Sequence, residues 1–210
     1  MATRKPIILY GFQKSGHSHR AELMLRLLGL PFEFREVDLP GGEHKGEAFL
    51  KLNPFGQVPV IDDNGAIIAD STAILVYLAK TYDPAGHWLP SDAIAAAQAQ
   101  RWLSVAQGPL VNGPAAARLV NVFGAALDHA KAKDISHKLF ATLELALADA
   151  AFFTGAQPTI ADVALYTYIA HAPEGGVALE PYANLRAWLK RIEALPRFAP
   201  MPATQVGLAA

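Results

Sequence analysis

The first part of the chain alternates between strand-like and helix-like hydrophobic patterns. A short apolar run at 7–10, ending at Gly11, predicts a buried strand, and residues 21–28 place apolar side chains at helical spacing. Residues 32–37 alternate apolar and polar side chains, as a half-buried strand does. This order predicts two parallel strands joined by a right-handed helical crossover.

A hairpin and a further helix follow. The apolar segments 58–61 and 66–69 flank Asp63-Asn64-Gly65, which is a typical tight-turn sequence. Asp70-Ser71 then begins another helical pattern, and a short helical stretch is expected near 47–52. The N-terminal half is therefore predicted to have the order β-α-β, loop, β-β-α.

The pattern changes at Asp83-Pro84-Ala85-Gly86, beyond which alanine is dense and the apolar spacing is helical. Gly108-Pro109 and Gly113-Pro114 are expected to end or kink helices, and the tail from Pro196 is expected to be coil along the surface. The helices are predicted at 92–107, 114–130, 134–150, 160–170 and 185–195. The fold class is thus an α/β domain at 1–82, a linker at 83–91 and an all-α helical domain at 92–210.

Composition narrows the possible functions. The 210 residues are 52% hydrophobic and 18% charged, which provides for a buried core, and a net charge of −1 argues against binding to nucleic acid or to a membrane surface. The chain has no cysteine, so thiol chemistry would require a ligand thiol, and no cysteine-based metal site is expected. Without a transmembrane run or a signal sequence, the expected location is the cytoplasm.

Two dipeptides have both a structural and a functional interpretation. Val58-Pro59 precedes a predicted strand, where proline either starts the strand in trans or forms a cis bond that turns the Val58 backbone toward an extended ligand. Asp70-Ser71 begins a helix, where either residue caps the helix or the free N–H groups bind a carboxylate.

The segment Ser15-Gly16-His17-Ser18-His19-Arg20 follows the first strand, where the first helix begins. A hydroxyl there either caps the helix or donates to an anion. A free thiol has a pKa of about 8.5, and lowering it by about two units requires roughly 2.7 kcal/mol of preference for the thiolate. One hydroxyl hydrogen bond and a helix N-terminus suffice for that.

Together these stretches resemble the glutathione S-transferase family, in its cytosolic, serine-type, bacterial-like form. The resemblance runs through Ser15 to Arg20, then Leu52-Asn53-Pro54-Phe55-Gly56-Gln57-Val58-Pro59-Val60, then 70–78. Thr159 with Asp162 is similar to the family's capping-box helix start. The resemblance implies a thioredoxin-like N-terminal domain, a helical C-terminal domain and a homodimer.

The resemblance also assigns the thiol chemistry. It implies that Ser15 hydrogen-bonds the glutathione sulfur, with Ser18 as the residue that shares or replaces this role. Tyr10 lies near the position of the catalytic hydroxyl in tyrosine-type classes and is a weaker candidate. His17 and His19 either assist or merely flank the helix.

For binding, the resemblance implies that Val58 pairs through its backbone with the cysteinyl part of glutathione and that Pro59 is cis. Asp70 and Ser71 would hold the γ-glutamyl end, and Gln57 would reach the ligand backbone or its glycine carboxylate.

Some positions depart from the family pattern or stay open. Asp70 replaces the commoner glutamate, and Gly56 lies where some serine-type classes have a ligand-contacting histidine. Lys45 is a candidate for the glycine carboxylate or a solvated loop residue. Phe55 lies where many family dimers insert an aromatic side chain into the partner, although it could equally pack within its own domain.

The helical half is expected to provide a pocket for a small apolar electrophile, with Trp102, Val105 and Asn112 as its lining candidates; core packing is the alternative for Trp102. The first hypothesis is a glutathione transferase that activates the thiol for attack on this electrophile. A glutathione-dependent isomerase, a disulfide reductase and a non-catalytic binding protein with the same fold are the alternatives.

Overall fold

The computed structural model describes residues 5–206, so the ends of the predicted domains at 1–4 and 207–210 lie outside the described residues. The chain divides into two compact units. The first comprises the described residues up to Gly86 together with Pro196–Met201, and the second comprises His87–Leu195 and the described residues from Pro202. The tail from Pro196 therefore belongs first to one unit and then to the other.

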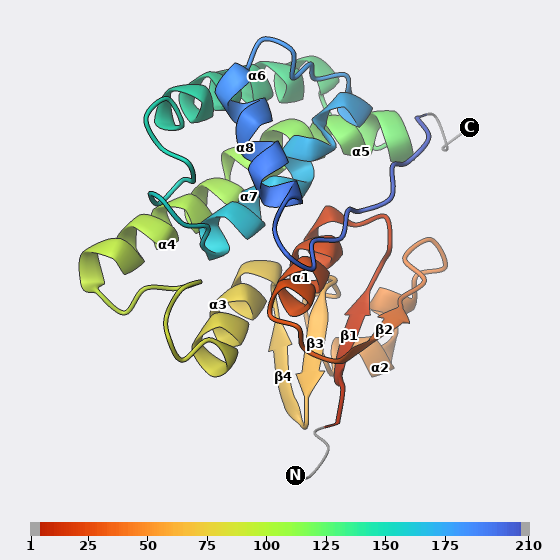
Figure 1. Cartoon of the computed structure of the whole chain (residues 1–210). Helices are drawn as coiled ribbons and strands as arrows, with labels where there is room; N and C mark the ends of the chain where they lie inside the picture. Colours follow the sequence, from red (N-terminus) through yellow and green to blue (C-terminus); the bar gives the residue numbers. More distant parts are fainter. Residues whose placement is uncertain (1–4, 207–210) are drawn as a thin grey trace. The chain divides into compact units, whose positions relative to one another are not determined.

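The first unit is built on a four-stranded mixed sheet with the strand order β2-β1-β3-β4. The parallel pairing of β1 with β2 and the antiparallel hairpin of β3 and β4 are both as predicted. The elements in chain order are β1 (Ile7–Gly11), α1 (Gly16–Leu27), β2 (Phe32–Glu36), η1 (Glu43–Lys45), α2 (Glu47–Leu50), β3 (Val60–Asp63), β4 (Ala66–Ala69) and α3 (Ser71–Tyr82). This is the thioredoxin-like arrangement that the sequence predicted (Figure 1).

Helices cover both faces of this sheet. Phe49 of α2 packs with Val37 and Val60, and half-buried Tyr10 packs against them. Leu9 and Ile61, which alternate with Tyr10 and Val60 along β1 and β3, are fully buried on the opposite face. Helices α1 and α3 pack against each other and against the strands, so the first turns of both helices are held by the same core.

The second unit is helical. Its elements are α4 (Ala93–Gln107), the π-helical segment η2 (Val111–Ala115), α5 (Ala116–Phe123), α6 (His129–Ala146), α7 (Ile160–Ala170), η3 (Ala172–Gly175) and α8 (Ala183–Glu193). Helix α7 begins with the predicted capping box: Thr159 accepts from its first turn, and Asp162 accepts from the Thr159 N–H at 2.8 Å. Asp162 also accepts from the Trp188 indole at 2.9 Å, which ties α7 to α8.

The predicted helix at 114–130 is wrong at both ends. Pro114 lies inside a helical run, in a π-helical segment whose widened turn accommodates a residue without an N–H, so it does not begin a helix. Gly124, with φ of 65°, ends α5 in the left-handed conformation. Asp128 then caps α6, which therefore begins at His129 and ends at Ala146, earlier at each end than the predicted 134–150.

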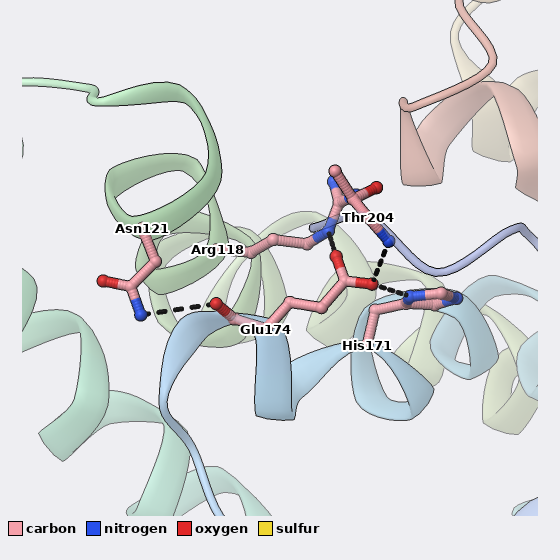
Figure 2. A network of polar contacts seen from close by, with 5 residues as sticks. All are labelled: Arg118, Asn121, His171, Glu174 and Thr204. Atoms are coloured by element: carbon pink, nitrogen blue, oxygen red, sulfur yellow. Dashed lines mark hydrogen bonds and ion pairs between the residues drawn. The ribbon is translucent and has the colours of Figure 1, made fainter. Parts of the chain in front are cut away.

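The C-terminal tail is coil, as predicted, but it is anchored in the interior. Met201 and Thr204 are buried. Glu174 accepts from Thr204 N–H at 2.9 Å and lies 2.5 Å from Arg118 Nε, and Arg118 Nη2 donates to Thr204 Oγ1 at 2.8 Å (Figure 2). His171 Nδ1 lies 2.7 Å from the same carboxylate. The tail end is thus fixed by a buried ion pair and its hydrogen bonds.

Candidate functional site

The N-terminus of α1 carries the first set of predicted residues. Ser15 is the N-cap, with φ of −89° and ψ of 120°, and its Oγ accepts from Ser18 N–H at 3.3 Å. Ser15 is half-buried, whereas Ser18 is fully buried and its Oγ accepts from Phe12 N–H at 3.1 Å. At this helix end, Ser15 is therefore the more exposed of the two serines. The Ser18 hydroxyl instead stabilises the preceding loop by accepting from Phe12 N–H.

The N-terminus of α3 carries the second set. Asp70 is exposed, has φ of 75°, and caps the helix by accepting from Thr72 N–H at 2.8 Å and Ala73 N–H at 2.9 Å. Ser71, the first helical residue, is 2% exposed. Residues at the start of a helix have N–H groups with no intrahelical acceptor, and the helix dipole favours an anion there. The structure therefore shows Asp70 as the cap of α3, and carboxylate binding at Asp70-Ser71 stays a prediction.

A polar contact joins the two helix ends. Nδ1 of His17, on the first turn of α1, lies 3.2 Å from Ser71 Oγ and 3.3 Å from Arg20 Nη1, and Arg20 donates to Ser71 Oγ at 2.8 Å. Burial and the nearby Arg20 charge lower the pKa of His17 to about 3, against an opposing contribution from Asp70. Sequence reasoning left His17 either assisting or merely flanking the helix, and it gave Arg20 no role of its own.

The loop before β3 holds the other predicted binding residues. Buried Asn53 donates to Gln57 O at 2.8 Å, and the Val58-Pro59 bond is cis, as the resemblance implied. Gln57 is exposed and Val58 is half-buried. Lys45 Nζ lies against this loop, 3.1 Å from Gly56 O.

The backbone conformation of this loop explains why position 56 is a glycine. Gly56 has φ of 57°, and a Cβ there would lie 2.7 Å from His44 O. A side chain at this position would strain the backbone and clash, so this loop conformation has no room for the histidine that some serine-type classes carry there.

The second-substrate candidates lie in the helical unit. Trp102 is 4% exposed, donates to Phe153 O at 2.8 Å, and has its ring centroid 4.7 Å from that of Phe153. This placement makes it part of the core. Val105, one turn further along α4, is half-buried, and Asn112 is exposed and donates to Gly108 O at 3.0 Å.

None of the described helices is both long and apolar enough to cross a membrane. Among residues 5–206, histidine and acidic side chains form no cluster suited to a metal ion.

Comparison with known proteins places this geometry in a family. Residues 15–81 match the model of the glutathione S-transferase N-terminal domain, and residues 114–191 match that of the C-terminal domain. The glutathione S-transferase theta-1 of Bos taurus is 33% identical over 178 residues, covering 79% of this chain and 73% of the relative.

Solved structures agree with this match. A glutathione S-transferase from Pseudomonas fluorescens superposes with a TM-score of 0.88 at 33% identity, covering 94% of this chain and 99% of that one. A glutathione transferase homologue from Drosophila mojavensis with bound glutathione has a TM-score of 0.81 at 30% identity, covering 91% and 89%. The two domain matches, the identity over most of the chain and the shared fold show that this chain belongs to the glutathione S-transferase family.

Proposed function

We propose that this protein lowers the thiol pKa of bound glutathione with the Ser15 hydroxyl and directs the thiolate at a small apolar electrophile. The observation that carries the proposal is the placement of Ser15 as the half-buried N-cap of α1, a helix of 12 residues. A thiolate beside Ser15 would accept a hydrogen bond from the hydroxyl and lie at the positive end of the helix dipole. Both interactions favour the anion over the thiol, which is what thiol activation requires.

The other end of glutathione suits the N-terminus of α3. Its γ-glutamyl group carries a carboxylate and an ammonium group. The Ser71 N–H, at the positive end of the α3 dipole, favours the carboxylate, and the exposed Asp70 carboxylate has the charge to pair with the ammonium. Val58, in the loop before β3, would pair through its backbone with the cysteinyl part of glutathione. Gln57 and Lys45 lie on or against the same loop and would serve the glycine carboxylate.

Ser18 is the alternative activating residue. Its hydroxyl is fully buried and already accepts from Phe12 N–H. Ser15 and Ser18 each accept one backbone N–H hydrogen bond, and each can still donate its own hydroxyl proton. Burial separates them: Ser18 is fully buried, whereas Ser15 is half-buried. The greater exposure of Ser15 favours it as the residue that donates to a ligand thiolate.

The proposed reaction is substitution or addition at carbon. The glutathione thiolate forms a carbon–sulfur bond to the electrophile, and the leaving group departs with the bonding electron pair, or a proton is taken up where the substrate is a double bond. Among the proposed second-substrate residues, Val105 and Asn112 keep exposed surface. Trp102 would act indirectly, by holding α4 in the core. Much of the rate enhancement would come from holding the two reactants together.

We also infer a cytoplasmic homodimer, as the family resemblance implies. Phe55 supports the dimer because 78% of its side chain is exposed, in the loop next to the proposed glutathione site. An exposed aromatic side chain of this size is a typical interface anchor.

The proposal is tested by comparing Ser15→Ala with Ser18→Ala in conjugation of glutathione to a chromogenic aryl halide. We expect Ser15→Ala to lower kcat at saturating glutathione and pH 7 by about 25-fold, because a thiol pKa that returns from about 6.5 to about 8.5 reduces the thiolate fraction from about three quarters to about 3%. Ser18→Ala should mainly lower stability, because Phe12 N–H loses its acceptor. Equal, undiminished conjugation in both variants would refute the mechanism.

Analysis of the reaction products distinguishes the alternative activities from conjugation. An isomerase would return free glutathione after turnover, and a disulfide reductase would yield oxidised glutathione. A wild-type protein that binds no glutathione would support the non-catalytic alternative.

A further inference from the structure

His17, Arg20 and Ser71 form a polar trio between the first turn of α1 and the first residue of α3. Arg20 is fully buried and Ser71 is 2% exposed, so their contact is shielded from bulk water. In a site shielded from water, the direction in which a hydroxyl group donates affects the affinity for a ligand. A buried hydroxyl that points away from its acceptor costs more free energy than one in water.

Elementary chemistry assigns the direction of each hydrogen bond. A guanidinium group carries only donors, so Ser71 Oγ accepts from Arg20 Nη1, and its own proton points to another acceptor. His17 Nδ1 faces both the guanidinium nitrogen and the hydroxyl, so it is the unprotonated nitrogen of a neutral ring, with the ring proton on Nε2. The lowered pKa of His17, about 3, keeps the ring neutral at physiological pH.

This assignment leaves Ser71 as a donor. Ser71 Oγ accepts from Arg20, and its hydroxyl proton can go to His17 Nδ1 or to an anionic ligand over the start of α3. When the proton goes to a carboxylate, His17 Nδ1 still accepts from Arg20 Nη1 and so keeps the guanidinium group donating to Ser71. The positive charge of Arg20 lies one hydrogen bond behind Ser71, where it favours the same anion.

We propose that His17 and Arg20 are positioning residues that hold the Ser71 hydroxyl ready to donate to the γ-glutamyl carboxylate of glutathione. The inference rests on the proposed function, since it takes glutathione as the ligand at α3. It separates two tasks: Ser15 acts on the thiol, whereas the trio acts on the carboxylate.

The test compares two ligands by titration calorimetry on the full chain. One is glutathione, and the other is γ-aminobutyryl-cysteinyl-glycine, which lacks only that carboxylate. We expect His17→Leu to weaken glutathione binding about fivefold and to leave binding of the analogue unchanged. His17→Asn, which places an amide oxygen near the position of Nδ1, should restore glutathione affinity to within about twofold of wild type.

Two further measurements probe the mechanism. In a Ser71→Ala background, His17→Leu should cause no additional loss of glutathione affinity, because the two residues act through one hydroxyl. Arg20→Gln should weaken glutathione binding about tenfold and the analogue much less. Since Arg20 is buried, this variant is first checked for folding by circular dichroism. If it is unfolded, the comparison of His17→Leu with His17→Asn provides the test.

Equal weakening of both ligands by His17→Leu would overturn the inference, because it would indicate general distortion of the site. Unchanged glutathione affinity in that variant would overturn it as well. Absence of glutathione binding by the wild type would instead overturn the proposed function, so the two failures are distinguishable.

Discussion

His17 is held neutral by its surroundings. Its folded-state pKa of about 3 lies below the value of about 6.5 expected for an unfolded chain. The unfolded state therefore binds an extra proton as the pH falls below about 6.5. Stability is unaffected by this group above that pH and is lost progressively between about 6.5 and 3, by up to about 1.4 kcal/mol per pH unit.

Replacing His17 by Asn should remove this acid sensitivity. Between about pH 7 and about pH 5, the wild type should lose about 2 kcal/mol more unfolding free energy than His17→Asn does. Urea denaturation of both proteins at the two pH values measures the difference. If the two proteins lose the same free energy, the neutral state assigned to His17 is wrong.

The sequence predicted the residues at the two helix ends but not the contact between them. Ser15 and Asp70 are recognisable because a hydroxyl or carboxylate before an apolar helical run is a local signal for a cap. His17 and Ser71 are 54 positions apart, and their contact depends on how α1 packs against α3. A single sequence carries no local signal for such a distance.

At the level of elements, Glu174 organises the end of the helical unit. Its carboxylate faces Arg118, which is 2% exposed, and also receives hydrogen bonds from Thr204 N–H and His171 (Figure 2). Burial by itself raises the pKa of Glu174, but the hydrogen bonds from Thr204, His171 and Arg118 outweigh it and lower the pKa overall. The ionised form is therefore the one that stabilises the fold.

Glu174→Gln should lower the free energy of unfolding by about 3 kcal/mol at neutral pH, because the buried Arg118 would lose its ion pair with Glu174. Thr204→Val is the matched variant: it removes only the Oγ1 acceptor of Arg118 and should cost about 1 kcal/mol. Urea denaturation near neutral pH measures both.

The pH dependence has a definite sign. A lowered folded-state pKa means that the Glu174 contribution is present above the unfolded value of about 4.3 and is lost as the pH falls through the folded pKa. The cost of Glu174→Gln should therefore shrink in acid. A cost that is independent of pH would contradict the ion pair.

Helices and strands could be predicted where the spacing of hydrophobic residues and the turn-forming residues indicate the same boundaries. The alternation at 32–37 and the turn at Asp63-Asn64-Gly65 were sufficient to predict β2 and the β3–β4 hairpin. The helix predicted at 114–130 failed because Pro114 is absorbed in a π-helical turn and does not begin a helix. The caps Gly124 and Asp128 mark the true boundaries.

At the scale of the whole molecule, the chain forms two units. After α8, which lies in the second unit, Pro196–Met201 belong to the first unit and the described residues from Pro202 belong to the second. The change in composition near Asp83–Gly86 is a local feature of the sequence, and the main segment of the first unit ends at Gly86. The assignment of Pro196–Met201 to the first unit had no such signal, because it depends on tertiary contacts such as that of His19 Nε2 with Ala199 O at 2.9 Å.

The proposed homodimer is expected to depend on the exposed side chain of Phe55. Phe55→Ala should weaken the homodimer at least tenfold, because two-fold symmetry makes each substitution count twice and a buried phenylalanine contributes about 2 kcal/mol or more. Ile94→Ala is the control, since Ile94 is 75% exposed in the other unit. Sedimentation over a range of concentrations gives the dissociation constants. A monomeric wild type, or equal effects of the two variants, would refute the interface.

If Ser15 stabilises the thiolate of bound glutathione, replacing it should raise the pKa of the bound thiol. This is measured by following thiolate ultraviolet absorbance against pH for glutathione bound to wild type, Ser15→Ala and Ser18→Ala. We expect a thiol pKa about two units below the free value of about 8.5 in wild type and Ser18→Ala, and a return toward that value in Ser15→Ala. A bound thiol with an unshifted pKa in the wild type, or a lowered pKa that persists in Ser15→Ala, would contradict it.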